Sequence, residues 1–233
     1  MLSRALPLAA SAALLLSLTA CGSSDGGDSA AESSSASSSA SGGSGTTCDY
    51  PTDTANGAAK KVDAPPSQAA YSGDVEATIT TSVGDLKLTL DADKAPCTVN
   101  SFVSLAQQGY YDDTSCHRLG DTSGFHMLQC GDPTGTGMGG PGYTVPDEYT
   151  GKETYPAGTL AMARTSQPNS GGSQFFMVFG DTQLAPEYTV FGTLDDASVK
   201  LLEKVAAAGT DNSEGQGVGK PLKPVTFEKV TIG

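Results

Sequence analysis

The sequence of 233 residues predicts a mostly β domain, an antiparallel barrel covered by two helices. Many apolar residues beyond position 74 alternate with polar ones in short runs, which is the pattern of strands with one buried face. Two longer segments, one after Pro96 and one after Asp195, instead carry apolar residues every three or four positions. Short strands together with two widely separated helices indicate an antiparallel barrel with helical covers.

The first 20 residues predict a signal peptide rather than part of the fold. A short basic start ends at Arg4, and residues 5–20 are apolar and uncharged. This stretch is shorter than the roughly 20 apolar residues that a membrane span needs, and it suits a secretory signal. The sequence Leu18-Thr19-Ala20-Cys21 resembles a bacterial lipobox, in which the cysteine is lipidated and becomes the new N-terminus. We therefore expect a protein anchored through Cys21 on the extracytoplasmic face of the cell membrane; an ordinary signal peptide with a chance cysteine is the alternative.

Two segments of different composition separate this signal from the predicted domain. Residues 21–47 comprise Cys21 and a stretch that is Gly, Ser, Ala or Thr in all but three positions. Such a stretch buries too little apolar surface to fold and predicts a tether with a span of roughly 25–30 Å. Residues 48–74 show no period and predict an irregular arm. The domain itself is expected over residues 75–233.

Four cysteines remain after Cys21, and an even number in an exported chain predicts disulfides. They allow three connectivities. Cys116 and Cys130 flank a predicted hairpin, which favours that pair and leaves Cys48 with Cys97. Because no CxxC or paired Cys/His spacing is present, the sequence suggests no zinc or other metal site.

The charge is acidic, with 26 Asp and Glu against 13 Lys and Arg. Nucleic acid and anionic lipid would be repelled, so neither is expected as a direct partner, and membrane contact is expected through the lipid anchor only. Nothing in the sequence suggests more than a monomer.

The domain begins with a predicted hairpin. Apolar residues alternate over 75–79 and again over 86–90, with a turn at Val83-Gly84-Asp85 between them. A helix is predicted next, because Pro96 stands at its start, apolar residues recur at helical spacing, and Gly109 follows its end.

The second half predicts further strands and one more helix. Residues 110–159 are short strands broken by Gly and Pro, whereas 160–163 and 174–179 look like interior strands and 188–192 like another strand. The second helix is capped by Asp195 or Asp196 and ends at Gly209. An alternating strand over 225–232 closes the chain.

Several kinds of catalytic machinery are missing. No GxSxG nucleophile motif is present, and residues 135–140 fit GxGxxG only by spacing, since Pro141-Gly142 follows and no helix begins there. A glycine-rich turn is the better interpretation, and no cofactor is expected.

Five short motifs together resemble the cyclophilin family in order and separation, over about residues 75–232. They are HR at 117–118, MLQCGDP at 127–133, GTG at 135–137, PNSGGSQFF at 168–176 and YTVFG at 188–192. The cysteine positions and the lipobox resemble an exported actinobacterial branch. The resemblance implies an eight-stranded antiparallel barrel capped by two helices, a surface groove, and peptidyl-prolyl cis-trans isomerase activity on proline-containing polypeptides.

The resemblance also implies roles for individual residues. Arg118 matches the catalytic arginine, and Phe176 matches the floor of the proline pocket. The other residues that match the substrate groove are Met127, Gln129, Ala163, Gln174, Leu184 and Tyr188.

An arginine suits this chemistry on physical grounds. The barrier of about 18–20 kcal/mol comes from amide resonance, so a catalyst must hold the twisted amide better than the planar one. A guanidinium that donates to the prolyl nitrogen localises the lone pair there and weakens the double-bond character. Arginine is permanently charged and needs no adjustment of its pKa for this task.

The sequence departs from the family at several groove positions. The Phe that precedes Met in the family is His126 here, with Phe125 one step earlier, so either ring could line the groove; substrate affinity should depend on pH if His126 does. The family's Asn is Arg164. Gln183 stands where cyclosporin-sensitive members commonly carry Trp, so weak cyclosporin binding is expected.

Two rival functions follow from the same sequence. A non-catalytic peptide-binding or chaperone module would keep the groove, and Arg164 and His126 are the residues that favour it. Arg118 favours the enzyme. A lipid-anchored solute-binding protein would usually need a larger, two-lobed chain.

Overall fold

A computed structural model describes residues 45–233. The predicted signal peptide 1–20, the predicted lipidation site Cys21 and the tether up to residue 44 lie outside these residues. Within residues 45–233, no helix has the length and apolar character needed to cross a membrane.

The domain is built on a ten-stranded sheet whose neighbouring strands all pair antiparallel. The order across the sheet is β3-β10-β1-β2-β8-β6-β7-β5-β4-β9. Two of these strands, β3 and β9, have only two residues each, so the remaining eight correspond to the predicted number. The strands are β1 Asp74–Thr81, β2 Gly84–Asp91, β3 Thr114–Ser115, β4 Arg118–Thr122, β5 Phe125–Cys130, β6 Thr159–Met162, β7 Phe175–Val178, β8 Val190–Leu194, β9 Val218–Gly219 and β10 Thr226–Ile232.

The sheet curls because one segment pairs with both ends of this order. Residues 114–122 pair with β10 at their start, through β3, and with β5 at their end, through β4. Cys116 and His117 bridge the two, and their N–H groups donate to the carbonyls of Val225 and Gln129. The chain thus brings Arg118, the first residue of β4, to the point where the two ends of the sheet meet.

The predicted first hairpin is confirmed as β1 and β2. Ile79 lies opposite Leu86, and the leucines at 86, 88 and 90 are fully buried while their neighbours along the strand are less so. This alternation is what puts one face of a strand into the core.

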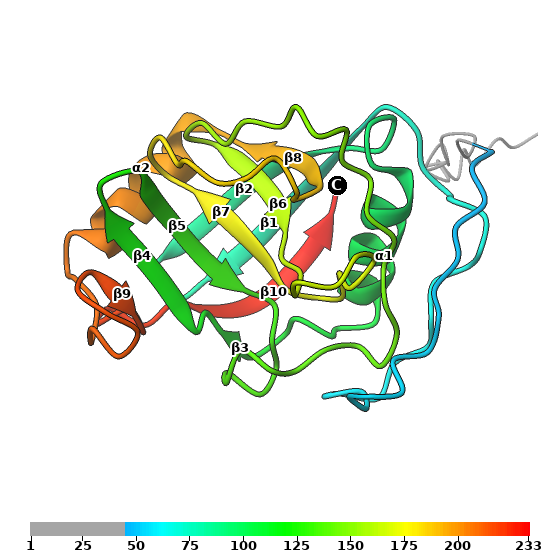
Figure 1. Ribbon diagram of the computed structural model, residues 1–233, viewed down its shortest axis with the longest axis horizontal. Coiled ribbons are helices and arrows are strands. Elements are labelled where there is room, and N and C mark those ends of the chain that lie inside the picture. The colour runs from blue at the N-terminus through cyan, green and yellow to red at the C-terminus, as the bar shows by residue number, and fades with distance from the viewer. Residues whose placement is uncertain (1–44) are drawn as a thin grey trace, which may run out of the picture. The chain divides into compact units, whose positions relative to one another are not determined.

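Both predicted helices are confirmed, as α1 Pro96–Gln107 and α2 Asp196–Ala206. α1 packs against β10 and β2, and α2 against β2 and β4 (Figure 1). Asp195 is the cap of α2, because its carboxylate accepts the N–H of Ser198 at 2.8 Å. Such a cap stabilises a helix by about 1 kcal/mol.

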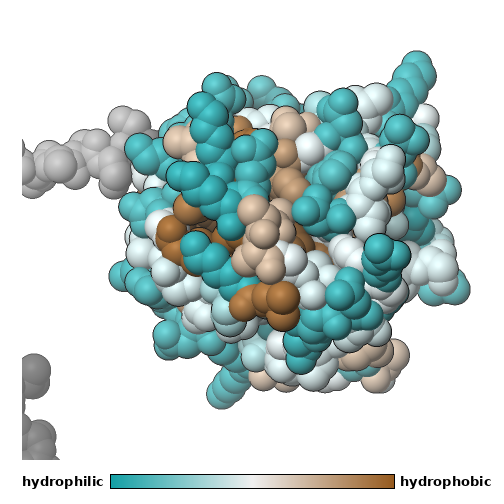
Figure 2. Space-filling model, turned by 90° about the vertical axis from the view of Figure 1, so that its left-hand side faces the viewer, coloured by the Kyte–Doolittle hydropathy of each residue, from teal (hydrophilic) through white to brown (hydrophobic). Residues whose placement is uncertain are grey.

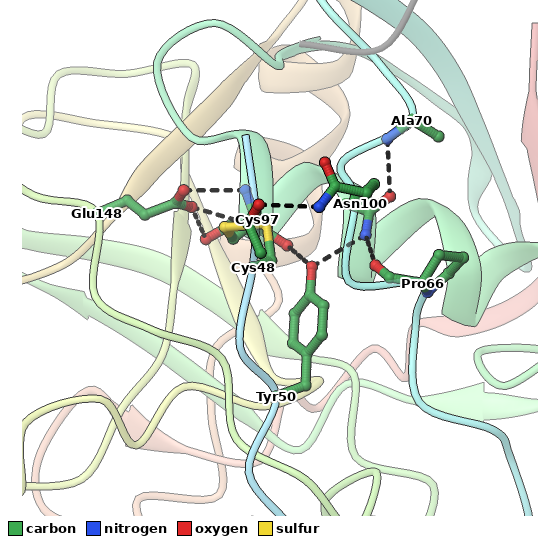
Figure 3. The surroundings of a disulfide bond; sticks show 10 residues. Cys48, Tyr50, Pro66, Ala70, Cys97, Asn100 and Glu148 are labelled. Atoms are coloured by element: carbon green, nitrogen blue, oxygen red, sulfur yellow. Dashed lines mark hydrogen bonds between the residues drawn. A yellow bond between two sulfur atoms is a disulfide. The ribbon is translucent and has the colours of Figure 1, made fainter. Parts of the chain in front are cut away.

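The arm is irregular as predicted, but it is fixed to the domain. The disulfide Cys48–Cys97 joins it to the first turn of α1, and the Tyr50 hydroxyl donates to the carbonyl of Cys97 at 2.8 Å (Figure 3). Asn100 then donates to Tyr50 and to the carbonyl of Pro66. The arm is therefore held at both its beginning and its end.

The start of α1 is stabilised by a residue distant in sequence. Glu148 accepts the N–H groups of Cys97 and Thr98 at 2.9 and 2.8 Å, and the Thr98 hydroxyl at 2.7 Å (Figure 3). These N–H groups have no partner within the helix, and a carboxylate there also meets the positive end of the helix dipole.

The second disulfide, Cys116–Cys130, spans the β4–β5 hairpin with 4.1 Å between the two Cα atoms. Both predicted pairings are therefore confirmed. This bridge joins the residue two positions before Arg118 to the residue directly after Gln129.

Candidate active site

Arg118 lies at the start of β4, opposite Gln129 on β5. Its side chain is 33% exposed, and the guanidinium carbon lies 5.4 Å from the centre of the Phe125 ring. Gly120 makes room for that ring, since a Cβ at this position would be 2.3 Å from Phe125 Cε1. The guanidinium is thus held over an aromatic face at the surface.

A hollow of about 330 Å³ lies beside the guanidinium. All but two of the residues predicted for the groove line it. They are Arg118, Phe125, Met127, Gln129, Ala163, Arg164, Phe176, Leu184 and Tyr188. The two exceptions are His126 and Gln174. We call this hollow the proline pocket.

Aromatic rings form one wall of the proline pocket. The rings of Phe176 and Tyr188 meet edge to face with their centres 5.3 Å apart. Behind them is Tyr155, which is buried and contacts both rings at 6.2 and 6.0 Å. The Tyr155 hydroxyl accepts the N–H of Tyr188 at 3.0 Å and donates to the carbonyl of Ala185 at 3.2 Å. Burial raises the pKa of Tyr155, so the hydroxyl keeps its proton.

Strand alternation decides between Phe125 and His126. Side chains one residue apart on β5 point to opposite faces, and Phe125, Met127 and Gln129 share the face of the proline pocket. His126 points the other way, with Nδ1 2.8 Å from the Asp121 carboxylate and its ring 5.9 Å from that of Phe179. The expectation that His126 could line the groove is therefore corrected, and the pH dependence tied to it loses its basis.

Gln174 belongs to a neighbouring hollow instead. Its carbonyl oxygen accepts Gln129 Nε2 at 2.9 Å, and its own Nε2 donates to the carbonyls of Gly137 and Gly139. It thereby connects the proline pocket with a second hollow of about 190 Å³. The arm contributes Asp53 and Asn56 to the lining of this second hollow, which the sequence did not predict.

Asp132 shapes the loop that accepts from Gln174. Its carboxylate is buried and accepts the N–H groups of Thr134, Thr136 and Gly137. Burial alone would raise the pKa of Asp132, but the hydrogen bonds from Thr134 and the loop N–H groups outweigh it and hold the pKa below its usual value. The glycine-rich segment 135–140 is therefore a turn organised by a carboxylate.

Arg164 lines both hollows, but its two terminal nitrogens are occupied. Its side chain is 9% exposed, and its terminal nitrogens donate to the carbonyls of Glu187 and Gln167 at 3.3 and 3.1 Å. The guanidinium also lies over the ring of Tyr149, with 5.7 Å to its centre. Arg164 therefore acts as a fixed wall rather than as a free cation.

His117 lies beneath the loop, next to Arg118. It is buried, and a Cβ on Gly137 would lie 3.3 Å from its Cδ2. Burial lowers the pKa of His117, so the ring is neutral at neutral pH and adds no second positive charge beside the guanidinium.

Comparisons with known proteins agree with this fold. Residues 76–232 match the family model described as cyclophilin type peptidyl-prolyl cis-trans isomerase/CLD. The chain belongs to that family. The curled antiparallel sheet with two helices is the fold expected from the resemblance.

Three curated relatives from mycobacteria show how similar the sequence is to individual members of the family. The chain is 42% identical over 205 residues to a probable peptidyl-prolyl cis-trans isomerase B of Mycobacterium tuberculosis. The matched region covers 81% of this chain and 64% of that relative. A relative of the same description from Mycobacterium leprae is 42% identical over 203 residues, with 81% and 67% covered. The chain thus spans about two thirds of the length of these curated relatives. A peptidyl-prolyl cis-trans isomerase A of Mycobacterium tuberculosis is also similar, with 37% identity over 171 residues. This match covers 67% of the present chain and 91% of the relative.

A solved structure shows the same fold. A cyclophilin type peptidyl-prolyl cis-trans isomerase of Cryptosporidium parvum, solved in the presence of the dipeptide Ala-Pro, is 35% identical with a TM-score of 0.59. It covers 68% of this chain and 98% of its own.

Proposed function

We propose that this chain is a peptidyl-prolyl cis-trans isomerase that acts on exported polypeptides outside the membrane. The observation that carries the proposal is the guanidinium of Arg118 at the edge of a pocket with an aromatic wall formed by Phe176 and Tyr188. A proline ring needs an apolar enclosure, and its amide nitrogen needs a donor when the bond twists. The two requirements meet in this pocket.

The pocket residues divide the work of isomerisation. Phe176, Met127 and Leu184 enclose the pyrrolidine ring, while Gln129 offers polar contacts to the flanking peptide. Arg118 donates to the prolyl nitrogen, whose lone pair becomes available only as the amide leaves planarity. That hydrogen bond is stronger in the twisted state than in the planar one, which is the condition for lowering the barrier.

The setting outside the membrane rests on separate observations. The lipobox-like sequence ending at Cys21 predicts a lipid anchor, and Cys48, Cys97, Cys116 and Cys130 form two disulfides, which persist in oxidising compartments. A Cys21→Ser variant should lose membrane association and appear in the soluble fraction. Continued membrane association of this variant would contradict the anchor.

A protease-coupled assay on an Ala-Pro peptide tests the activity, using the full-length chain in mild detergent. The wild type should accelerate isomerisation, Arg118→Ala should abolish the acceleration, and a Lys229→Ala control on the exposed edge of β10 should not. Calorimetry with the same peptide should show that Arg118→Ala still binds. Binding without turnover in the wild type would instead support the non-catalytic module.

A further inference from the structure

Arg118 lies between the proline pocket and a third, polar hollow of about 280 Å³, and it lines both. Glu214 lines this polar hollow and is not part of the proline pocket. Its Oε2 lies 2.7 Å from Nε of Arg118, and its side chain is 46% exposed. The carboxylate therefore meets the guanidinium from the side that faces away from the proline pocket.

The loop around Glu214 is held by contacts that do not involve the Glu214 side chain. Asp211 Oδ1 accepts the N–H groups of Ser213 and Lys220 at 3.0 and 2.8 Å, and Asn212 Oδ1 accepts the N–H of Gly217 at 2.7 Å. Such side-chain to backbone hydrogen bonds fix tight turns. A substitution of the Glu214 side chain should therefore leave these loop hydrogen bonds, and with them the backbone of the loop, in place.

The same loop is attached to the strand that carries Arg118. β9 pairs with β4, and the N–H of Asp121 donates to the carbonyl of Gly217 at 2.9 Å. Gly217 allows this close approach, since a Cβ there would be 2.8 Å from the Asp121 carbonyl oxygen. Arg118 and Glu214 therefore belong to one hydrogen-bonded unit of β4, β9 and the loop before β9.

The face of the molecule on this side is mostly hydrophilic, with small separate hydrophobic patches (Figure 2). No broad apolar surface is seen there that would indicate a docking partner for the 210–219 loop. The 210–219 loop contacts the proline-pocket residue Arg118 through the side chain of Glu214.

We propose that Glu214 is a positioning residue for Arg118, an inference that rests on the proposed isomerase function. An arginine side chain is long and flexible, and a donor misplaced by about 1 Å loses much of its catalytic effect. Glu214 anchors Nε from one side and the Phe125 ring supports the guanidinium plane from another. Two contacts from different sides restrict the orientations that the guanidinium can take.

The competing interpretation is an inert surface ion pair, which is the usual outcome for exposed charges. A third is an inhibitory contact that draws Arg118 out of the groove. Arg118 keeps its contact with Phe125, a proline-pocket residue, while paired with Glu214. The pair and the groove-facing arrangement thus coexist in one conformation, which favours positioning over inhibition.

Steady-state kinetics of the full-length chain distinguish the three. Glu214→Gln keeps the shape and removes the charge, and Glu203→Gln on the exposed face of α2 is the matched control. We expect Glu214→Gln to lower kcat by about three- to ten-fold with KM unchanged, because a half-exposed pair is modest in energy and Glu214 does not line the proline pocket. Glu203→Gln should leave both constants unchanged. An unchanged or higher kcat in Glu214→Gln would overturn the proposal.

A spectroscopic readout tests the contact without relying on turnover. The arginines of the chain are Arg4, Arg118 and Arg164, and Arg4 lies in the predicted signal peptide, so [15N]arginine labelling of the processed protein gives two Nε signals, and Arg118→Lys identifies which is that of Arg118. The Arg118 Nε proton should exchange slowly with water in the wild type and fast in Glu214→Gln, with Glu203→Gln like the wild type. Equal exchange in all three would refute the ion pair. If the wild type shows no turnover but its Arg118 Nε proton exchanges slowly, the proposed isomerase function and the positioning role of Glu214 are both refuted. The contact between Glu214 and Arg118 would still be established in that case.

Discussion

Removing the hydroxyl of Tyr155 should weaken both the fold and the proline pocket. This hydroxyl accepts the N–H of Tyr188 at 3.0 Å and donates to the Ala185 carbonyl at 3.2 Å, so it ties the 185–188 segment to the aromatic wall. In Tyr155→Phe the ring contacts with Phe176 and Tyr188 survive, and only the hydrogen bonds are lost. The change therefore isolates the hydrogen bonds of one hydroxyl group from the packing of the ring.

The expected loss of stability can be worked out from the two groups that lose their partner, the half-buried N–H of Tyr188 and the carbonyl of Ala185. Such a loss costs about 1–2 kcal/mol, which lowers the melting temperature of a domain of this size by roughly 2–8 °C. Because Tyr188 lines the proline pocket, KM for an Ala-Pro peptide should rise while kcat stays close to the wild-type value.

Urea unfolding with both disulfides intact measures this free energy, and the coupled assay measures KM. Tyr71→Phe is the matched control, since the Tyr71 hydroxyl makes one exposed hydrogen bond, with Gln107 at 3.1 Å. Its effect should stay within about 0.5 kcal/mol. If Tyr155→Phe is no less stable than Tyr71→Phe, then the hydroxyl does not hold the 185–188 segment and the reasoning fails.

Three further substitutions test other contacts. Gly120→Ala should displace the Phe125 ring, which a Cβ would approach to 2.3 Å, and lower kcat/KM by about ten-fold in the coupled assay; wild-type kinetics would contradict this. Glu148→Ala should destabilise the domain by about 1–2 kcal/mol in urea, because the N–H groups of Cys97 and Thr98 lose their acceptor. The lowered pKa of His117 means that the unfolded chain binds a proton that the folded chain refuses, so the free energy of unfolding should fall as the pH drops below about 6.5. His117→Gln should flatten that dependence between pH 7 and 5.5, and an unchanged slope would show that His117 is not its source.

Local patterns predicted the elements that depend on local rules. The alternation of Leu86, Leu88 and Leu90 and the Asp195 cap follow from strand period and helix capping, and both appear in the structure. The strand expected over 188–192 is found at Val190–Leu194 instead. The reason lies outside the segment, because the Tyr188 N–H is taken by Tyr155 rather than by a neighbouring strand.

The motifs predicted most of the pocket, and geometry supplied the rest. Arg118 and Phe176 lie in recognisable motifs, whereas the choice of Phe125 over His126 depends on which face of β5 meets the pocket. Tyr155 stands in a stretch without period, and its partners lie about 30 residues away, so no local signal marks it. In the sequence, Glu214 is one of many acidic residues and nothing marks it. Only the pairing of β9 with β4 brings it next to Arg118. The expected weak cyclosporin binding stays a prediction.

The central claim is that the directed donors of the Arg118 guanidinium, not its charge alone, accelerate the rotation about the X-Pro bond. Exchange spectroscopy on an Ala-Pro peptide at equilibrium measures the cis-trans rate directly, without a coupling protease, for the wild type, Arg118→Lys and Arg118→Ala. Lysine keeps the charge but lacks the planar fork of donors. The account predicts rapid exchange with the wild type and near-background exchange with both variants. Rapid exchange with Arg118→Lys would show that the charge alone is enough, and rapid exchange with Arg118→Ala would show that the side chain is not needed; either result would contradict the claim.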